Sequence, residues 1–258
     1  MSFLLSPELS ALRQRVRAFV DERVLPMERA IVDEDRAGQH VTLRSLQAQA
    51  REAGLWTPHL PVELGGLGLG PMGMAALFRE MGRSPVGARV FNCDAPDQGN
   101  MDLLLQVASP EIRERWLQPL VDAEITSAFA MTEPAPGAGA DPTNLRTRAV
   151  RDGDEWVIDG HKWYTTGGGQ ASFLILMART SPDQRKGATM FVVDRHAEGV
   201  EHVRDYGTMG EPMLTHREAE FRFHGVRLPD SAVLGGVGEG FQLAQMRLVP
   251  ARLTHCMR

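Results

Sequence analysis

Apolar residues recur every three to four positions through the first half of the chain, which is the spacing that one face of an α-helix produces. Ser6 followed by Pro7 is typical of a helix N-cap and first turn, and Leu9, Leu12 and Val16 continue the apolar face. Further helices are predicted by the same spacing, with Thr42 as a cap or with proline and glycine at the ends, over residues 42–53, 71–82, 98–107 and 110–117.

After residue 125 the period changes to that of β-strands. Arg151-Asp152-Gly153-Asp154-Glu155 is a hairpin turn signal, and the strand-forming residues of 156–159 follow it. Residues 173–178 and 189–194 are short apolar runs typical of buried strands, and residues 218–223 alternate between charged and apolar side chains. Many short strands between glycine and proline turns predict a small antiparallel barrel or sandwich.

The changes of period predict an α+β protein with three parts. These are an amino-terminal all-α domain over residues 1–124, a middle antiparallel β-domain over 125–234, and the start of a carboxy-terminal helical bundle over 235–258. No proline- or glycine-rich linker separates the first two. The helical spacing that returns after Gly240 stops early, so we expect a truncated protein.

Composition narrows the class of protein. The 258 residues are 43% hydrophobic and 24% charged, with a net charge of −5, which indicates a globular chain without a basic face for nucleic acid. Cys93 and Cys256 predict neither a disulfide framework nor a metal site, and the eight histidines lack ligand spacing. No apolar run reaches the roughly 18–20 residues of a membrane span, and the amino terminus is too short in apolar length for a signal peptide. We therefore expect a cytoplasmic protein.

Two glycine-containing runs carry the candidate chemistry. The first is Thr132-Glu133-Pro134 followed by residues 137–141, a loop with few side chains that lets backbone amides approach an anionic ligand. The second, residues 160–169, offers aromatic faces and the Thr165 and Thr166 hydroxyls before a glycine turn. Either run alone could be an ordinary turn, with its aromatic and threonine residues simply forming a strand.

Together and in this order, the two runs resemble the flavin-binding core of the acyl-CoA dehydrogenase family. The resemblance extends over nearly the whole chain, through residues 54–68, 129–134 and 238–241. Residues 91–100 and 252–258 are similar to the subgroup whose animal members are fused to a phosphotransferase-like domain. The resemblance implies FAD as cofactor, an acyl-CoA substrate, an electron-transfer flavoprotein as electron acceptor, and a homodimer or homotetramer at full length.

The resemblance also implies a role for particular residues. The backbones of Met131 and Thr132 would contact the pyrimidine edge of the flavin, Tyr164 would lie against its ring system, and Thr166 would place its hydroxyl near N5 as a hydrogen-bond donor. The full set of residues implied to bind the cofactor is Phe129, Met131, Thr132, Gly139, Ala140, Tyr164, Thr165 and Thr166. Arg252, together with Ala140, would contact the substrate, although Arg252 could equally be a solvated surface residue.

The chain departs from the family pattern at Ala140, where relatives carry a serine that touches flavin phosphate or coenzyme A, after an insertion of Ala135-Pro136. The loss of one hydrogen bond, worth roughly 0.5–1.5 kcal/mol, would weaken binding without abolishing it. The resemblance places the general base beyond Arg258, so that the 258-residue chain is expected to be inactive. Glu133 is expected to have a structural role, and Arg247 has no assigned role.

Two classes of function stay open. The first is an acyl-CoA dehydrogenase that forms the 2-enoyl-CoA. The second is a non-catalytic subunit or fragment that binds FAD or acyl-CoA. Within the enzyme class, acyl-CoA oxidases and flavin monooxygenases share the fold, and the sequence does not indicate the acyl chain length.

Overall fold

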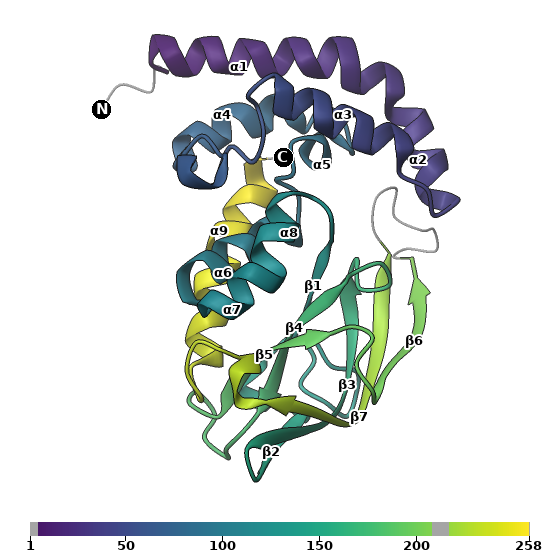
Figure 1. Ribbon diagram of the computed structural model, residues 1–258, viewed down its shortest axis with the longest axis vertical. Helices are drawn as coiled ribbons and strands as arrows, with labels where there is room; N and C mark the ends of the chain where they lie inside the picture. The colour runs from purple at the N-terminus through teal and green to yellow at the C-terminus, as the bar shows by residue number, and fades with distance from the viewer. Residues whose placement is uncertain (1–4, 208–216, 258) are drawn as a thin grey trace. The chain divides into compact units, whose positions relative to one another are not determined.

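The computed structural model describes residues 5–207 and 217–257 (Figure 1), so residues 1–4 of the amino terminus and Arg258 of the last motif lie outside it. The chain divides into two compact units. One comprises residues 1–98 with 250–258 and is helical, and the other comprises residues 99–249 and carries the strands.

The helical unit begins as the sequence predicts. Ser6 caps α1 (Pro7–Phe19), where its hydroxyl accepts the Leu9 amide at 3.2 Å, and a π-helical turn (Val20–Val24) and a 3₁₀ turn (Leu25–Met27) follow at Pro26. The other helices of the unit are α2 (Glu28–Arg36), α3 (Val41–Glu52), α4 (Pro71–Met81) and α5 (Gly87–Val90). Within this unit α1 packs against α4, and α3 packs against both α2 and α5.

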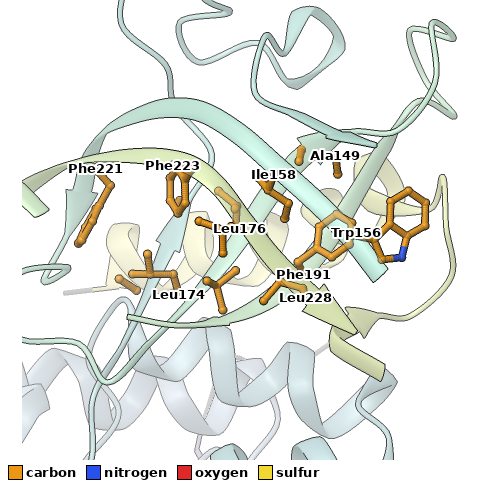
Figure 2. Packing of buried hydrophobic residues seen from close by; sticks show 14 of the residues in the cluster. Ala149, Trp156, Ile158, Leu174, Leu176, Phe191, Phe221, Phe223 and Leu228 are labelled. Atoms are coloured by element: carbon orange, nitrogen blue, oxygen red, sulfur yellow. The ribbon is translucent and has the colours of Figure 1, made fainter. Parts of the chain in front are cut away.

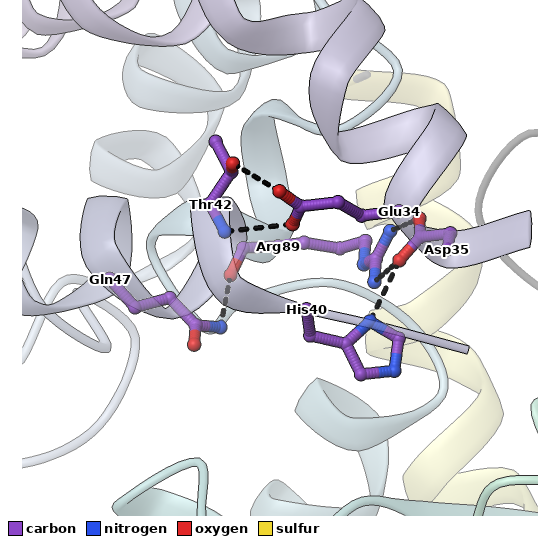
Figure 3. A network of polar contacts seen from close by, with 6 residues as sticks. All are labelled: Glu34, Asp35, His40, Thr42, Gln47 and Arg89. Atoms are coloured by element: carbon purple, nitrogen blue, oxygen red, sulfur yellow. Dashed lines mark hydrogen bonds and ion pairs between the residues drawn. The ribbon is translucent and has the colours of Figure 1, made fainter. Parts of the chain in front are cut away.

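The prediction that Thr42 caps α3 is wrong, because the helix begins one residue earlier with His40 at the N-cap position. The acceptor that a capping side chain would supply comes from Glu34 of α2. Its carboxylate accepts the Thr42 amide at 2.8 Å and the Thr42 hydroxyl at 2.5 Å. The cap is therefore a tertiary contact between two helices (Figure 3).

A second carboxylate of α2, Asp35, joins α5 to the same network (Figure 3). Arg89 of α5 contacts Asp35 through both terminal guanidinium nitrogens, with Nη2 3.0 Å from Oδ1, and His40 Nδ1 lies 2.9 Å from Oδ1. The Arg89 carbonyl accepts the side-chain amide of Gln47 on α3 at 3.0 Å. These contacts connect the three helices α2, α3 and α5 through polar side chains.

The second unit begins with helices and continues into a sheet. Its helices are α6 (Asp97–Val107), α7 (Pro110–Ile112), which continues as a π-helical turn (Arg113–Leu117), and α8 (Gln118–Val121). The strands are β1 (Ser127–Ala130), β2 (Arg148–Asp152), β3 (Glu155–Thr166), β4 (Phe173–Arg179), β5 (Ala188–Asp194), β6 (Val200–Tyr206), β7 (Glu218–Pro229) and β8 (Val233–Leu234).

The strands form one sheet in the order β6-β7-β3-β2-β4-β5-β8, with β1 beside β4. Most neighbours are antiparallel, whereas β1 and β2 each pair with β4 in parallel. The hairpin predicted at residues 151–155 joins β2 to β3, with Gly153 in the left-handed region at φ +62°. The predicted α+β fold is confirmed, with the two parallel pairings as a departure from the purely antiparallel expectation.

Large apolar side chains of the strands pack together in one buried cluster (Figure 2). Trp156 and Ile158 of β3, Leu174 and Leu176 of β4, and Phe191 of β5 pack in one cluster with Phe221, Phe223 and Leu228 of β7. This core fixes the strands whose ends carry the candidate site.

Helix α9 (Gly240–Met257) confirms the helical spacing after Gly240. It continues through Pro250 and passes from one unit into the other. The boundaries of the three domains that the sequence suggests stay a prediction.

Candidate functional site

The structure brings the two glycine-containing runs together. The Trp163 amide of β3 donates to the Thr132 carbonyl at 3.0 Å, and the Glu133 amide donates to the Gly139 carbonyl at 3.0 Å. Residues 131–133, which follow β1, therefore lie between the end of β3 and the 137–147 loop.

The Glu133 carboxylate organises this junction. Its side chain is 2% exposed and accepts backbone amides from Ala138 at 3.0 Å, Arg146 at 2.7 Å and Thr147 at 2.8 Å. A fourth donor is Lys162 Nζ at 2.9 Å, on a side chain that is 0% exposed. A carboxylate with this many donors in place has no free lone pairs for a proton from a substrate, which agrees with a structural role for Glu133.

Both members of this ion pair are charged at neutral pH. Burial disfavours the charged form of Glu133, but the Lys162 charge and the amides of Arg146 and Thr147 outweigh it and lower the pKa to about 2. Burial lowers the pKa of Lys162 to about 8, against the opposing effect of Glu133. The pair is thus a fixed element of the site.

Lys162 also sets the direction of the backbone at Met131. Its Nζ donates to the Met131 carbonyl at 2.8 Å. In a trans peptide the carbonyl of one residue and the amide of the next point in opposite directions, so the Thr132 amide points away from Lys162. Among the residues that the structure describes, that amide has no acceptor, and it is available to a ligand.

Glycines let the 137–147 loop pass close to Glu133. A Cβ atom at Gly137 would lie 2.7 Å from the Glu133 Cβ and 2.8 Å from Oε2, and Gly139 has a φ of +59° that favours glycine. Ala140 is exposed and offers no side-chain donor. The next residue, Asp141, accepts the Thr143 amide at 2.9 Å and hydroxyl at 2.7 Å, and these bonds lower its pKa.

The end of β3 is irregular at Tyr164. The pairing of β3 with β7 shifts register between Lys162 and Thr165, and Tyr164 has a φ of +48°. Its amide donates to the Tyr206 hydroxyl of β6 at 3.0 Å, and its ring is 47% exposed. The Tyr164 ring lies 4.8 Å from that of Trp163 and 5.4 Å from that of Tyr206, which leaves an aromatic surface at the strand end.

The two threonines that follow the irregularity are neighbours in the strand, and they have different surroundings because successive side chains point to opposite faces. Thr165 is fully buried, and its hydroxyl has no partner within the described ranges. The Thr166 hydroxyl lies 3.1 Å and 3.0 Å from the two carboxylate oxygens of Glu218 on β7. No motif in the sequence indicates Tyr206 or Glu218 as neighbours of this site.

The ring of Phe129 on β1 packs against the buried guanidinium group of Arg247. The Arg247 guanidinium of α9 is centred 4.1 Å from the Phe129 ring, and its Nε donates to the Asn100 carbonyl oxygen at 2.7 Å. Asn100 in turn donates to Ser127 at 2.8 Å. Arg247, to which the sequence assigned no role, therefore packs against the strand that leads into the site.

Arg252 belongs to the helical unit, whereas the other predicted site residues belong to the second unit. It is exposed on α9. Its predicted contact with substrate stays a prediction.

The residues that the structure gathers fit a flavin. The Thr132 amide is a free donor for a polar ring edge, and Tyr164 presents an exposed aromatic face. The indole nitrogen of Trp163 is a buried donor without a partner among the described residues. These features match a flat, heteroatom-rich ligand better than a metal ion, and within the described ranges no cluster of His, Cys, Asp and Glu could hold a metal.

Two further findings concern the rest of the chain. Neither Cys93, which is buried, nor Cys256, which is exposed, is part of a disulfide among the residues that the structure describes. Among residues 5–207 and 217–257, no helix combines the length and the apolar character needed to cross a membrane.

Two family models match the chain. The N-terminal domain of acyl-CoA dehydrogenase matches residues 6–124, and the middle domain of acyl-CoA dehydrogenase matches residues 128–223. The second match contains both glycine runs of the candidate site.

The individual proteins whose sequences resemble this chain are also named as acyl-CoA dehydrogenases. The chain is 37% identical, over its whole length and 65% of the relative's, to "Probable acyl-CoA dehydrogenase FadE2" of Mycobacterium tuberculosis. It is 34% identical to mouse acyl-CoA dehydrogenase family member 10, over 98% of the chain and 25% of that protein, which confirms the resemblance to the animal subgroup.

Solved structures agree with the sequence relatives. A structure from Mycobacterium abscessus assigned to the acyl-CoA dehydrogenases superimposes with a TM-score of 0.89 at 41% identity, over 98% of this chain and 66% of the other. A glutaryl-coenzyme A dehydrogenase in complex with glutaryl-CoA superimposes with a TM-score of 0.81 at 26% identity, over 100% and 64%. The chain thus spans about two thirds of these structures, and it belongs to the acyl-CoA dehydrogenase family.

Proposed function

We propose that the protein is an FAD-dependent dehydrogenase that oxidises an acyl-CoA thioester to the 2-enoyl-CoA. Membership of the family supports an oxidoreductase, and the match to the glutaryl-CoA complex supports a coenzyme A thioester as substrate. The observation that carries the proposal is the Lys162–Glu133 pair, which fixes the Met131 carbonyl and leaves the Thr132 amide available as a donor.

The proposed reaction converts a saturated carbon–carbon bond of the acyl group into a double bond. The thioester loses a proton from its α-carbon and a hydride from its β-carbon, and a double bond forms between the two carbons. A bound flavin supplies the acceptor of that hydride at N5. The α-proton needs a general base, for which we keep the prediction that it lies beyond Arg258.

The chain's own residues bind and orient the cofactor in this proposal. The Thr132 amide would donate to the pyrimidine edge of the flavin, which becomes more negative on reduction, and the Lys162–Glu133 ion pair holds that donor in place. Phe129, which packs against Arg247, lies on β1, the strand that leads to Thr132. Tyr164 would lie against the ring system and Thr166 near N5, while Gly139 and Ala140 would let the 137–147 loop approach the phosphate groups.

The remaining predictions belong to the same proposal. The electron acceptor is an electron-transfer flavoprotein, the complete protein forms a homodimer or homotetramer in the cytoplasm, and the 258-residue chain alone is inactive.

The test uses protein expressed from the complete reading frame. We expect a yellow protein with one bound FAD per chain, whose flavin absorbance bleaches when an acyl-CoA is added without oxygen. With an artificial dye as acceptor, dye reduction should be faster than peroxide formation in air.

The other outcomes separate the alternatives. Bound flavin that no acyl-CoA bleaches would indicate the non-catalytic binding subunit, and peroxide formed at the dye-supported rate would indicate an oxidase. Protein that neither contains FAD nor binds it on reconstitution would overturn the proposal.

A further inference from the structure

The Thr166 hydroxyl already has a partner inside the protein. Thr166 is the last residue of β3 and Glu218 the first residue of β7, and the two are paired in register. The hydroxyl oxygen lies 3.1 Å from one carboxylate oxygen of Glu218 and 3.0 Å from the other. Both residues are half-buried.

This contact determines the direction of the hydrogen bond. A hydroxyl group carries one proton and two lone pairs, and an ionised carboxylate can only accept. Thr166 must therefore donate its proton to Glu218. Toward any third group the hydroxyl then offers a lone pair and acts as an acceptor.

The surrounding backbone holds the two side chains together. The Gly167 amide, next to Thr166, donates to the Arg217 carbonyl, next to Glu218, at 2.9 Å. Tyr206 of β6 pairs with Glu218 on its other side and accepts the Tyr164 amide at 3.0 Å. Backbone pairing in three strands therefore holds Thr166 and Glu218 opposite each other.

We propose that Glu218 is a positioning residue that makes the Thr166 hydroxyl an acceptor toward N5 of a bound flavin. Oxidised flavin has a lone pair at N5, and reduced flavin has a proton there. An acceptor at this place favours the reduced form, so Glu218, acting through Thr166, raises the reduction potential of the flavin. This inference rests on the proposed function and reverses the donor role that the sequence suggested for Thr166.

The experiment must separate hydrogen bonding from charge, because removing the Glu218 carboxylate by itself stabilises the more negative, reduced flavin. A double-mutant cycle does this. The two-electron midpoint potential is measured for the FAD-loaded protein from the complete reading frame, for Thr166→Val, for Glu218→Leu and for the double variant. Thr165→Val is the matched control, since Thr165 is the neighbouring residue of the same strand and is fully buried.

We expect Thr166→Val to lower the potential in the presence of Glu218. The net worth of one hydrogen bond corresponds to about a three- to tenfold change in the ratio of oxidised to reduced flavin, which is a shift of about 15–30 mV for a two-electron couple. In the Glu218→Leu background the hydroxyl can rotate and serve either form, so the same substitution should shift the potential by less than half as much. Thr165→Val should shift the potential less than Thr166→Val does.

Two results would overturn the inference while leaving the flavin placement intact. They are a Thr166→Val shift of the same size in both backgrounds, and a shift toward higher potential. No shift from Thr166→Val in either background would instead show that N5 is not at Thr166, which contradicts the proposed site itself. Where Thr166→Val protein fails to retain FAD, Thr166→Ala provides the same comparison.

Discussion

Two carboxylates of this protein, Glu133 in the β-containing unit and Asp35 in the helical unit, each accept several hydrogen bonds but organise different things. Glu133 accepts three backbone amides and one ammonium group, and it is nearly inaccessible to solvent. Among the described residues, the Asp35 carboxylate contacts the side chains of Arg89 and His40, and it lies closer to the surface, at 11% exposure.

The difference lies in what each carboxylate holds. Because the donors to Glu133 are backbone amides of the 137–147 loop, the carboxylate fixes the path of the loop and, through Lys162, the direction of the Met131 peptide. Because the donors to Asp35 are side chains, that carboxylate connects helices and leaves their backbones unchanged. A carboxylate bonded to backbone can therefore shape a ligand site, whereas one bonded to side chains stabilises packing.

The largest effect is expected from Glu133→Gln. The amide keeps the size of the side chain but cannot accept from all four donors, and it leaves Lys162 buried without its anion. Loss of one partner of a buried pair costs about 3–5 kcal/mol, measured as the free energy of unfolding in denaturant. Lys162→Met should cost less, because three amides still solvate the carboxylate. Equal losses from the two variants would contradict the view that the amides are the main partners of Glu133.

Acid should remove the stability that the ionised Glu133 carboxylate contributes to the fold. The pKa of Glu133 is about 2 in the fold, below its usual value of 4.5, so the unfolded chain binds the proton more tightly and acid favours unfolding. The contribution is complete above pH 4.5 and disappears as the pH falls toward 2. The gap in unfolding free energy between wild type and Glu133→Gln should therefore narrow by about 3 kcal/mol over this range. A gap that stays constant with pH would contradict the assignment.

A smaller effect is expected from Asp35→Asn. The substitution weakens the paired contact with Arg89 and the contact with His40, and hydrogen bonds to charged groups contribute about 1.5–3 kcal/mol. Asp33→Asn, two residues away on α2, affects exposed contacts with Arg29 and Arg36 and should change little. A measurement of FAD affinity distinguishes the roles of the two carboxylates. Asp35→Asn should leave the affinity unchanged, whereas Glu133→Gln should lower it. Loss of FAD from Asp35→Asn would show that the helical network also shapes the site.

Much of the fold is determined locally, and the sequence predicted it. Ser6 with Pro7, and Pro71 with Gly82, mark helix ends because capping and the restricted backbone of proline act within one turn. The hairpin at Gly153 and the apolar strands β4 and β5 follow from the same short-range rules. The glycine runs at 137–141 and 160–169 indicated the candidate site because glycine has no side chain and therefore lets another group approach the backbone closely.

Other features depend on residues that are far apart in the sequence, and only the tertiary structure decided them. Glu218 lies 52 positions from Thr166, Tyr206 lies 42 from Tyr164, and Arg247 lies 147 from Asn100. The cap of α3 comes from Glu34 for the same reason. The irregularity at Tyr164, which precedes Thr165 and Thr166, occurs in a run of aromatic and β-branched residues that by itself predicts regular alternation. The sequence thus determined which groups are available, while the pairing of β3 with β7 determined which of them meet and in which direction their protons point.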